Sequence, residues 1–309
     1  MKFIKYSIEL ITCFALSVPA MAQRSTRSQG EVPPPKTKKA AQEQTVPHRS
    51  KKRSPQNTGV VAGQIRPRVF LNPGHGGHDS DDRPCPFYNE GMQARVEYYE
   101  SDSNLKGAMA MKDILRSRGY EVFMSRVNNT TDDDLNLFEI HQLALNSGAD
   151  VFFAIHSNSS GSATRRVNFP FAIYRGYDGG GTAEGSEELA GIVASNLADC
   201  EATSWSRGGL THGDWSFYRN RSGLGVFRWN KLPGILVENC FHDYQIERER
   251  LLNKDYCGLL ATINSRSLDK FFNRPAQQFG MVAGIVRYDY PRKGKRLTSF
   301  GKDAYQPLN

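Results

Sequence analysis

Short apolar runs alternate with segments of helical periodicity along this chain, and no other feature constrains its fold as strongly. The run at residues 69–71 (VFL) is closed by Pro73 and Gly74. From Ser103 to Arg118, apolar residues recur with a period close to 3.6. The first pattern predicts a buried strand that enters a loop, and the second predicts an amphipathic helix. A strand followed directly by a helix is typical of an α/β fold.

The alternation continues toward the C-terminus. Strand–helix–strand units form parallel sheets with right-handed crossovers, and strands that are apolar throughout are covered on both faces. We therefore expect an α/β fold of three layers (αβα) with a mostly parallel central sheet. Further strands are predicted at residues 120–124, 151–155, 169–174 and 235–237. Helices are predicted at 187–197, at 245–272 with a break near Asn253, and after the aspartates at 132–134, running to about Asn146.

Residues 1–22 have the pattern of a secretory signal peptide. Two lysines precede an apolar stretch at residues 10–18, and small residues lead up to Ala22, after which cleavage is expected. A lipid-modified Cys13 is the alternative, which Thr12 disfavours because it is a poor residue before a lipidated cysteine. No later run reaches the ~18 apolar residues that span a bilayer. We therefore expect an exported protein, periplasmic or extracellular, without stable membrane insertion.

Residues 23–66 form a basic segment rich in Pro, Gln, Ser and Thr. Positions 23–59 hold nine Lys and Arg against two Glu, a net charge of +7, while the whole chain carries +8. With few large apolar residues, this segment cannot bury enough surface to offset its ordering entropy, and a disordered linker is expected. Attraction to anionic wall polymers and a plain solvated spacer both remain open for it. The export signal argues against nucleic-acid binding.

The ordered domain is expected to span residues 67–274. Residues 275–309 then form a C-terminal extension, which is either the start of a truncated β domain or a final strand on the main sheet. Four cysteines remain after removal of the signal peptide, and they allow three disulfide pairings, although buried free thiols fit them equally well. None belongs to a CxxC pair, so a thiolate metal site is not expected.

Polar residues stand at the carboxyl ends of three expected strands. His75 follows the first strand, His156 follows the strand at 151–155, and Glu238 ends a later apolar run. In an open α/β sheet, ligands bind in the crevice outside the carboxyl ends of the strands. Glu100 precedes the first helix, and the start of a helix that follows a strand lies at the same edge. These four side chains are therefore expected to meet.

Two imidazoles and one carboxylate are the ligand set expected of catalytic zinc. We expect His75, Glu100 and His156 to bind Zn²⁺, and Glu238 to be the catalytic carboxylate that moves protons. A lone histidine after a strand is more often structural, but two of them at equivalent strand ends weaken that explanation. A glutamate at the end of so apolar a strand is costly unless it is paired or used. The other histidines have no comparable placement, and His141 is expected on a helix surface.

At these residues the chain resembles the zinc-dependent N-acetylmuramoyl-L-alanine amidases of type 3, α/β enzymes that free the stem peptide from the glycan of peptidoglycan. Their first ligand lies in a Pro-Gly-His-Gly-Gly motif, matched by residues 73–77, and their third lies in Ile-His-x-Asn, matched by 155–158. Their catalytic glutamate follows a strand matched by residues 233–238. The second ligand lies about nineteen residues before a Gly-Tyr turn, which Glu100 fits. Arg126 agrees with a Thr-Arg element, and a structural role is expected for it.

The same spacing selects Glu100 over its neighbours Glu90 and Glu97. Some positions depart from the pattern of the family. Cys240 stands where a glycine is common, and the segment at 81–99 is longer than the usual link to the second ligand. The set of metal ligands is intact despite these departures.

The resemblance implies an exported zinc hydrolase that cleaves the amide bond between N-acetylmuramic acid and L-alanine, with peptidoglycan as its partner. The alternative is a zinc amidohydrolase that acts on another N-acyl amino acid or peptide. An inactive wall-binding module is a third hypothesis, which the intact set of ligands disfavours. A further hypothesis is that Glu184, Glu187 or Glu188 covers the metal, although a helix with an acidic outer face explains these residues equally well.

Overall fold

The computed structural model of the protein describes residues 66–79, 82, 84–89, 93–161, 167–203 and 209–277. The expected signal peptide at 1–22, the linker at 23–66 apart from its last residue, and the extension beyond residue 277 lie outside these ranges. Of the helices that the structure describes, none is both long enough and apolar enough to cross a membrane.

Within the described residues, six strands form the central sheet, in the spatial order β4, β1, β5, β10, β6, β9. Their bounds are β1 (Arg68–Pro73), β4 (Glu121–Met124), β5 (Val151–Asn158), β6 (Phe171–Tyr174), β9 (Leu210–Gly213) and β10 (Gly234–Phe241). Strands β4, β1, β5 and β10 run parallel, whereas β6 is antiparallel to β10 and β9 is parallel to β6. The mostly parallel sheet is thus confirmed. The sequence does not predict β9, because its four residues (LTHG) form no apolar run.

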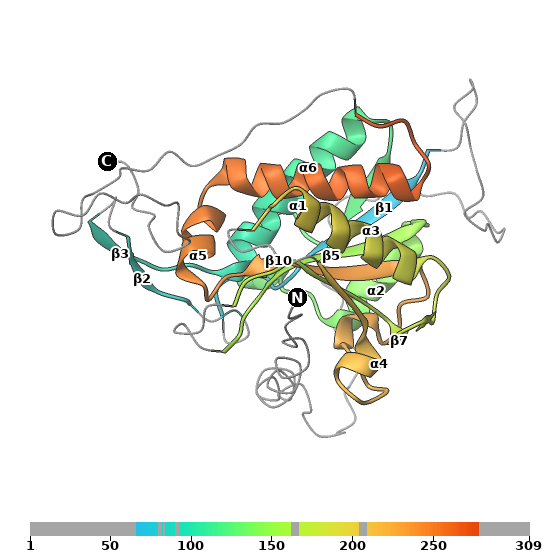
Figure 1. Ribbon diagram of the computed structural model, residues 1–309, viewed down its shortest axis with the longest axis horizontal. Coiled ribbons are helices and arrows are strands. Elements are labelled where there is room, and N and C mark those ends of the chain that lie inside the picture. Colours follow the sequence, from blue (N-terminus) through green and yellow to red (C-terminus); the bar gives the residue numbers. More distant parts are fainter. Residues whose placement is uncertain are drawn as a thin grey trace, which may run out of the picture. The chain divides into compact units, whose positions relative to one another are not determined.

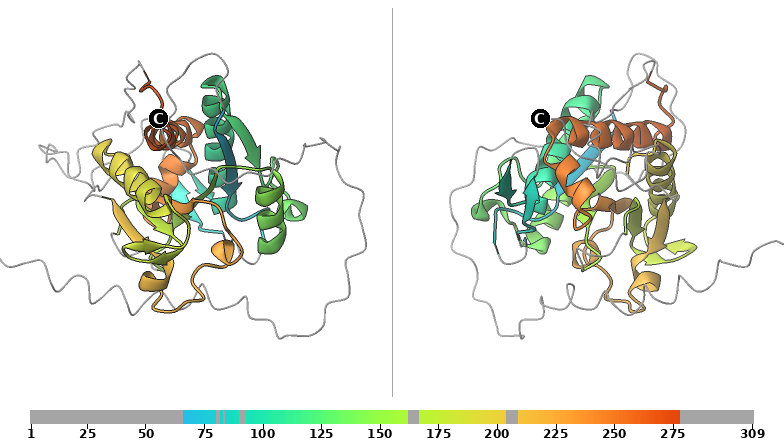
Figure 2. Two further views of the ribbon diagram at one scale, coloured as in Figure 1. Left: turned by 90° about the vertical axis from the view of Figure 1, so that its right-hand side faces the viewer. Right: turned by 60° about the vertical axis from the view of Figure 1, so that its left-hand side comes forward.

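Helices cover both faces of the sheet and give the three expected layers (Figure 1). One layer contains α1 (Glu100–Ser117), α3 (Ser186–Asp199), α5 (Gln245–Leu251) and α6 (Lys254–Phe271). The other contains α2 (Leu137–Asn146), α4 (Asp214–Phe217) and the 3₁₀ helix η3 (Gly225–Phe227). A further 3₁₀ helix, η2 (Thr131–Asp133), lies between β4 and α2 in the chain. Figure 2 shows α3 and α6 on the same side of the sheet.

Short antiparallel hairpins stand apart from the central sheet. They are β2 (Phe87–Asn89) with β3 (Ala94–Val96), and β7 (Gly176–Tyr177) with β8 (Gly180–Gly181). The first hairpin lies within the long segment at 81–99. The predicted break near Asn253 separates α5 from α6, where the Asn253 side chain accepts a hydrogen bond from Asp255 N (2.8 Å) as the N-cap of α6.

The cysteines within the described residues are free thiols. Cys240 and Cys257 are buried, and Cys85 Sγ accepts a hydrogen bond from Arg248 Nη1 (2.6 Å). Of the two possibilities that the sequence leaves open, the structure therefore has unpaired thiols rather than disulfides.

Two hydrophobic clusters fill the space between the layers of the described fold. Because successive side chains of a strand point to opposite faces, Phe153 enters the cluster beneath α1, α3 and α6, and Phe152 enters the cluster beneath α2. Phe152 stacks on Phe70 of the neighbouring strand, with ring centroids 5.8 Å apart. The apolar runs of β1 and β5 are thus buried on both faces, as continuous apolar strands require.

His141 of α2 is buried, so the prediction that it lies on a helix surface is wrong. The segment that leads into β10 covers this flank of the helix, since Leu224, Phe227 and Leu232 pack in the same cluster as α2. Burial lowers the pKa of His141, and the charge of Lys231 lowers it further, which favours the neutral imidazole.

Phe153→Ala is expected to lower the free energy of unfolding by about 3–5 kcal/mol, because this side chain is fully buried in the larger cluster. Phe138→Ala is the matched control. Its ring is 49% exposed and has an edge contact with Trp229, so the loss should stay below about 1.5 kcal/mol. Urea denaturation followed by circular dichroism measures both. Equal losses would contradict the central position of Phe153.

Candidate metal centre

Three side chains that can bind a metal converge where β1 ends and α1 begins. His75 lies two residues after β1, Glu100 is the first residue of α1, and His156 lies in β5. One ligand atom of each lies within 4.8 Å of the others, and no other such group is found in the described part of the chain. The structure thus brings together the three residues that the sequence selects. Glu100 begins the helix rather than preceding it.

The Glu100 carboxylate faces both imidazoles. Its Oε2 is 3.2 Å from His75 Nε2, and its Oε1 is 3.0 Å from His156 Nδ1. Burial by itself would raise the pKa of Glu100, but the two histidines outweigh it and hold this pKa well below its usual range. Asn104 Nδ2 (3.0 Å) and Ser157 N (2.9 Å) also donate hydrogen bonds to Oε1. A carboxylate that is kept ionised and oriented in this way suits a metal ligand.

The loop that carries His75 has a conformation that few residues can adopt. His75 has a φ of 60°, in the left-handed region that is costly for residues other than glycine. A Cβ added to Gly74 would overlap the imidazole of His156, so only glycine lets the loop pass beside that ring. Gly77 also has a positive φ, of 71°, and its N–H donates to Asn129 Oδ1 (3.0 Å). Strain of this kind is concentrated at functional sites.

Arg126, from the segment after β4, ties the loop after β1 to the start of α1. Its Nε donates to Pro73 O (3.1 Å), and its Nη2 donates to Gly74 O (3.0 Å) and Ser101 O (2.9 Å). Its Nη1 donates to two oxygens of residues 128–129. Burial lowers the pKa of Arg126 to about 10, which leaves the guanidinium charged at neutral pH. Arg126 thus contacts the loops of the site and not the ligand atoms.

Glu238 lies beside His156, because β5 and β10 pair in register at these two residues. Its side chain is partly buried, and its Oε2 is buried without a hydrogen-bond partner among the described residues. Burial raises the pKa of Glu238 well above its usual range, the charge of Glu100 raises it further, and His75 opposes them. A buried oxygen without a partner calls for an explanation, and a group bound between Glu238 and the histidines provides one.

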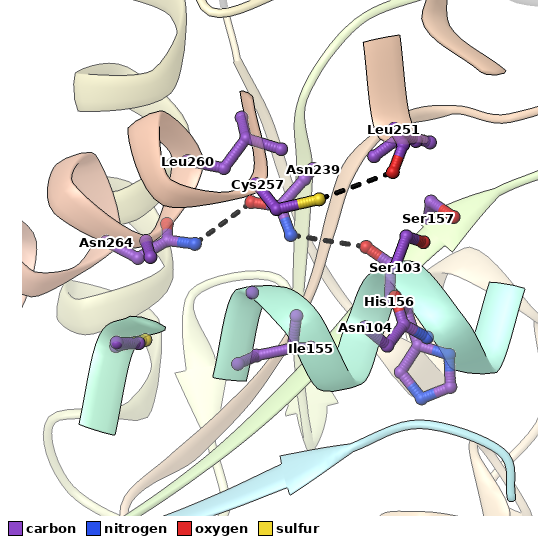
Figure 3. Close-up of a pocket in the computed structure, with 13 residues that line it drawn as sticks. Ser103, Asn104, Ile155, His156, Ser157, Asn239, Leu251, Cys257, Leu260 and Asn264 are labelled. Carbon is purple, nitrogen blue, oxygen red and sulfur yellow. Dashed lines mark hydrogen bonds between the residues drawn. The ribbon is translucent and has the colours of Figure 1, made fainter. Parts of the chain in front are cut away.

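Two asparagine side chains support β5 at His156 through hydrogen bonds (Figure 3). Asn239 Nδ2 donates to the backbone oxygen of His156 (3.3 Å), and Asn264 Nδ2 of α6 donates to Asn239 Oδ1 (2.9 Å). These residues line a cavity of about 20 Å³, to which Asn104 of α1 also contributes. The position of His156 is therefore fixed by directional hydrogen bonds as well as by the sheet.

The sequence does not assign two further residues of the site. His242 Nδ1 donates to Ser157 O (2.8 Å) and lies 3.7 Å from Glu100 Oε2. Its position depends on the turn of the chain after β10, which no sequence pattern marks. Asn104 follows Glu100 by four residues on the same helix, and this i,i+4 spacing is a signal that identifies it.

The other acidic candidates lie away from the ligand group. Glu97 is exposed and accepts a hydrogen bond from Tyr99 OH (3.3 Å), and Glu90 is outside the described residues. The acidic first turn of α3 begins at Ser186, whose Oγ accepts a hydrogen bond from Gly234 N (3.0 Å). Gly234 is the first residue of β10, so this turn lies at the N-terminal end of that strand. Glu238 lies farther along the strand, toward its carboxyl end.

An αβα fold with a His–Glu–His group and a spare carboxylate at the carboxyl ends of parallel strands is typical of metal-dependent hydrolases. Residues 69–269 match the family described as N-acetylmuramoyl-L-alanine amidase, and the chain belongs to this family. The resemblance inferred from the motifs is thus confirmed.

Individual relatives agree with this assignment. The sporulation-specific N-acetylmuramoyl-L-alanine amidase of Bacillus subtilis (strain 168) is 28% identical over 207 residues, which cover 67% of this chain and 68% of that protein. The crystal structure of an N-acetylmuramoyl-L-alanine amidase from Clostridium difficile 630 matches with a TM-score of 0.51 at 26% identity, covering 67% of this chain and 97% of that one. The catalytic domain of the amidase CwlV from Bacillus (Paenibacillus) polymyxa var. colistinus shares the fold at 23% identity, with a TM-score of 0.51 and coverage of 68% and 99%.

Gly74→Ala is expected to weaken metal binding at the His–Glu–His group by at least about 10-fold, because the added methyl group must displace the His156 ring. Gly107→Ala on α1 is the control, since a Cβ at this position would meet no atom within 4 Å outside the backbone of its own helix. This control should bind the metal as the wild type does and gain about 0.5–1 kcal/mol of stability. Metal content after dialysis against a zinc buffer measures the effect. Equal zinc content in the two variants would contradict it.

In the metal-free protein, Glu238→Gln is expected to raise the stability at pH 7 by on the order of 1 kcal/mol, because it removes a carboxylate whose buried Oε2 has no hydrogen-bond partner among the described residues. The raised pKa means that the folded state retains a proton that the unfolded state has released. The wild type should therefore lose stability relative to the variant as the pH rises from about 4. Thermal denaturation with chelator at several pH values tests this, and a difference independent of pH would refute it.

Proposed function

We propose that residues 67–274 are the catalytic domain of an exported, zinc-dependent N-acetylmuramoyl-L-alanine amidase. It hydrolyses the amide bond between N-acetylmuramic acid and L-alanine in peptidoglycan. Membership of the family supports the reaction and the substrate class. The observation that carries the proposal is the Oε2 of Glu238, which finds no hydrogen-bond partner among the described residues and lies on the strand beside the His–Glu–His group. A module that only binds the wall has no use for this carboxylate.

The metal ligands are His75, Glu100 and His156. Two imidazole nitrogens and a carboxylate oxygen form the donor set that catalytic zinc prefers, and they match the group found here. Bound zinc would supply Lewis-acid activation of water and of the scissile carbonyl near neutral pH. The pKa of Glu100, held low by its neighbours, keeps this ligand ionised over the whole working range.

Glu238 is the residue that moves protons. Its Oε2 takes a proton from the water that adds to the lactyl carbonyl carbon. It then returns the proton to the nitrogen of L-alanine as the carbon–nitrogen bond breaks. The products are a free lactyl carboxylate on the glycan and a stem peptide with a free amino terminus. A raised pKa suits this role, because the group must both accept and release a proton near neutral pH.

The segments outside the described domain fit an enzyme of the cell wall. Residues 1–22 carry the features of a signal peptide, so export precedes action on the wall. The basic linker at 23–66 would hold the domain near anionic wall polymers or act as a spacer.

Glu238→Gln is expected to keep its zinc and to lower the release of stem peptides from purified sacculi by about 10²–10⁴-fold, because the amide cannot act as a base. Metal analysis and mass spectrometry of the soluble products measure the two effects on the same sample. Glu97→Gln is the matched control, an exposed glutamate near the second ligand that should retain both properties.

Three other outcomes separate the alternatives. Full activity of Glu238→Gln on sacculi would show that another group moves the proton. A wild-type protein that holds zinc but cleaves only small N-acyl amino acids would favour a different amide substrate. Activity that survives complete removal of zinc by a chelator would rule out the metal-dependent reaction.

A further inference from the structure

Helix α1, which begins with Glu100, is capped by a residue from a different segment. Its own N-cap residue is Tyr99, whose side chain makes no capping hydrogen bond in the described structure. Asp82 takes that place, since its Oδ1 accepts from Glu100 N (3.0 Å) and its Oδ2 accepts from Ser101 N (2.8 Å). The first N–H groups of a helix have no partner within the helix, and a carboxylate also interacts favourably with the helix dipole there.

Asp82 is buried, with only 3% of its surface exposed, and the segment that follows it is anchored. Cys85 N donates to Tyr98 O (2.8 Å), which closes the base of the hairpin segment. Arg248 Nη1 donates to Cys85 O (3.3 Å), and the Arg248 guanidinium lies 5.1 Å from the ring centroid of Phe87. Asp82 therefore belongs to a packed part of the fold.

The two hydrogen bonds of Asp82 reach the metal site by separate routes. Glu100 is bound by Asp82 at its backbone and by the donors described above at its carboxylate, so a shift of the backbone would move the ligand atoms. Ser101 Oγ donates to Gly77 O (2.8 Å), in the loop that carries His75. The cap thus fixes the start of α1 against the loop of another ligand.

We propose that Asp82, which belongs to the long segment at 81–99, is a positioning residue for the metal ligand Glu100. The proposal rests on the proposed function, since it takes Glu100 as a zinc ligand. Asp82 acts on Glu100 through its main chain, since Asp82 Oδ1 accepts the hydrogen bond of Glu100 N.

Asp82→Ala and Asn136→Ala form a matched pair of cap deletions. Asn136 caps α2 through Phe138 N (3.1 Å) and Glu139 N (3.0 Å), and α2 carries none of the proposed ligands. Each deletion should lower the Tm by about 2–4 °C. Only Asp82→Ala should raise the Kd for zinc, by about 10–100-fold, measured by competition with a chromogenic chelator. Excess zinc should then restore its kcat on sacculi, because the proton-moving residue is unchanged.

Normal zinc affinity in a destabilised Asp82→Ala protein would show that Asp82 is a helix cap only, and would overturn the proposal. If this variant does not fold, Asp82→Asn, which keeps one acceptor oxygen, is measured instead. A smaller increase in Kd supports the proposal, and an unchanged Kd overturns it. If the wild type itself binds no zinc, the proposed function fails, and that result differs from zinc binding that is insensitive to Asp82.

Discussion

The hydrogen bonds of the buried Arg126 guanidinium hold the parts of the metal site in place. They join the loop after β1, the first turn of α1 and the turn after β4, which are far apart in the sequence. Removing a charge from water is costly, and the lowered pKa of Arg126 reflects that cost. The planar guanidinium offsets the cost by reaching five oxygen acceptors at once. The left-handed backbone of His75 depends on such a fixed frame, because strain persists only where the surroundings over-determine it.

The direction of the strands decides which polar residues can take part. His75, His156 and Glu238 meet because β1, β5 and β10 are parallel neighbours whose carboxyl ends share one edge. Strand β6 runs the other way, so the chain leaves it at the opposite edge, where the acidic turn of α3 begins. The direction of the strands thus separates the glutamates of the α3 turn from Glu238.

The sequence predicts a residue of this site where the neighbouring residues mark it, and misses it where its contacts come from distant segments. The histidine positions follow from apolar runs that end sharply before His75 and His156. Glu100 requires the spacing of the family motif, since Glu90 and Glu97 are residues of the same type in the same stretch of sequence. Asp82 and His242 are not predicted, because their contacts depend on how a long segment and a turn fold back onto α1. The burial of His141 is missed for the same reason, since the residues that cover it are far along the chain.

The surroundings of the site shift the pKa values of Glu100 and Glu238 in opposite directions. Glu100 faces two imidazoles and accepts neutral hydrogen bonds, so it stays ionised well below the usual range. Glu238 is partly buried, its buried Oε2 has no hydrogen-bond partner in the described part of the chain, and the charge of Glu100 lies nearby, so its proton is held more tightly. A carboxylate that is always ionised can serve as a ligand, and one with raised proton affinity can take and return a proton. The negative charge that suits Glu100 to the proposed metal site therefore also raises the proton affinity of Glu238, the proposed base.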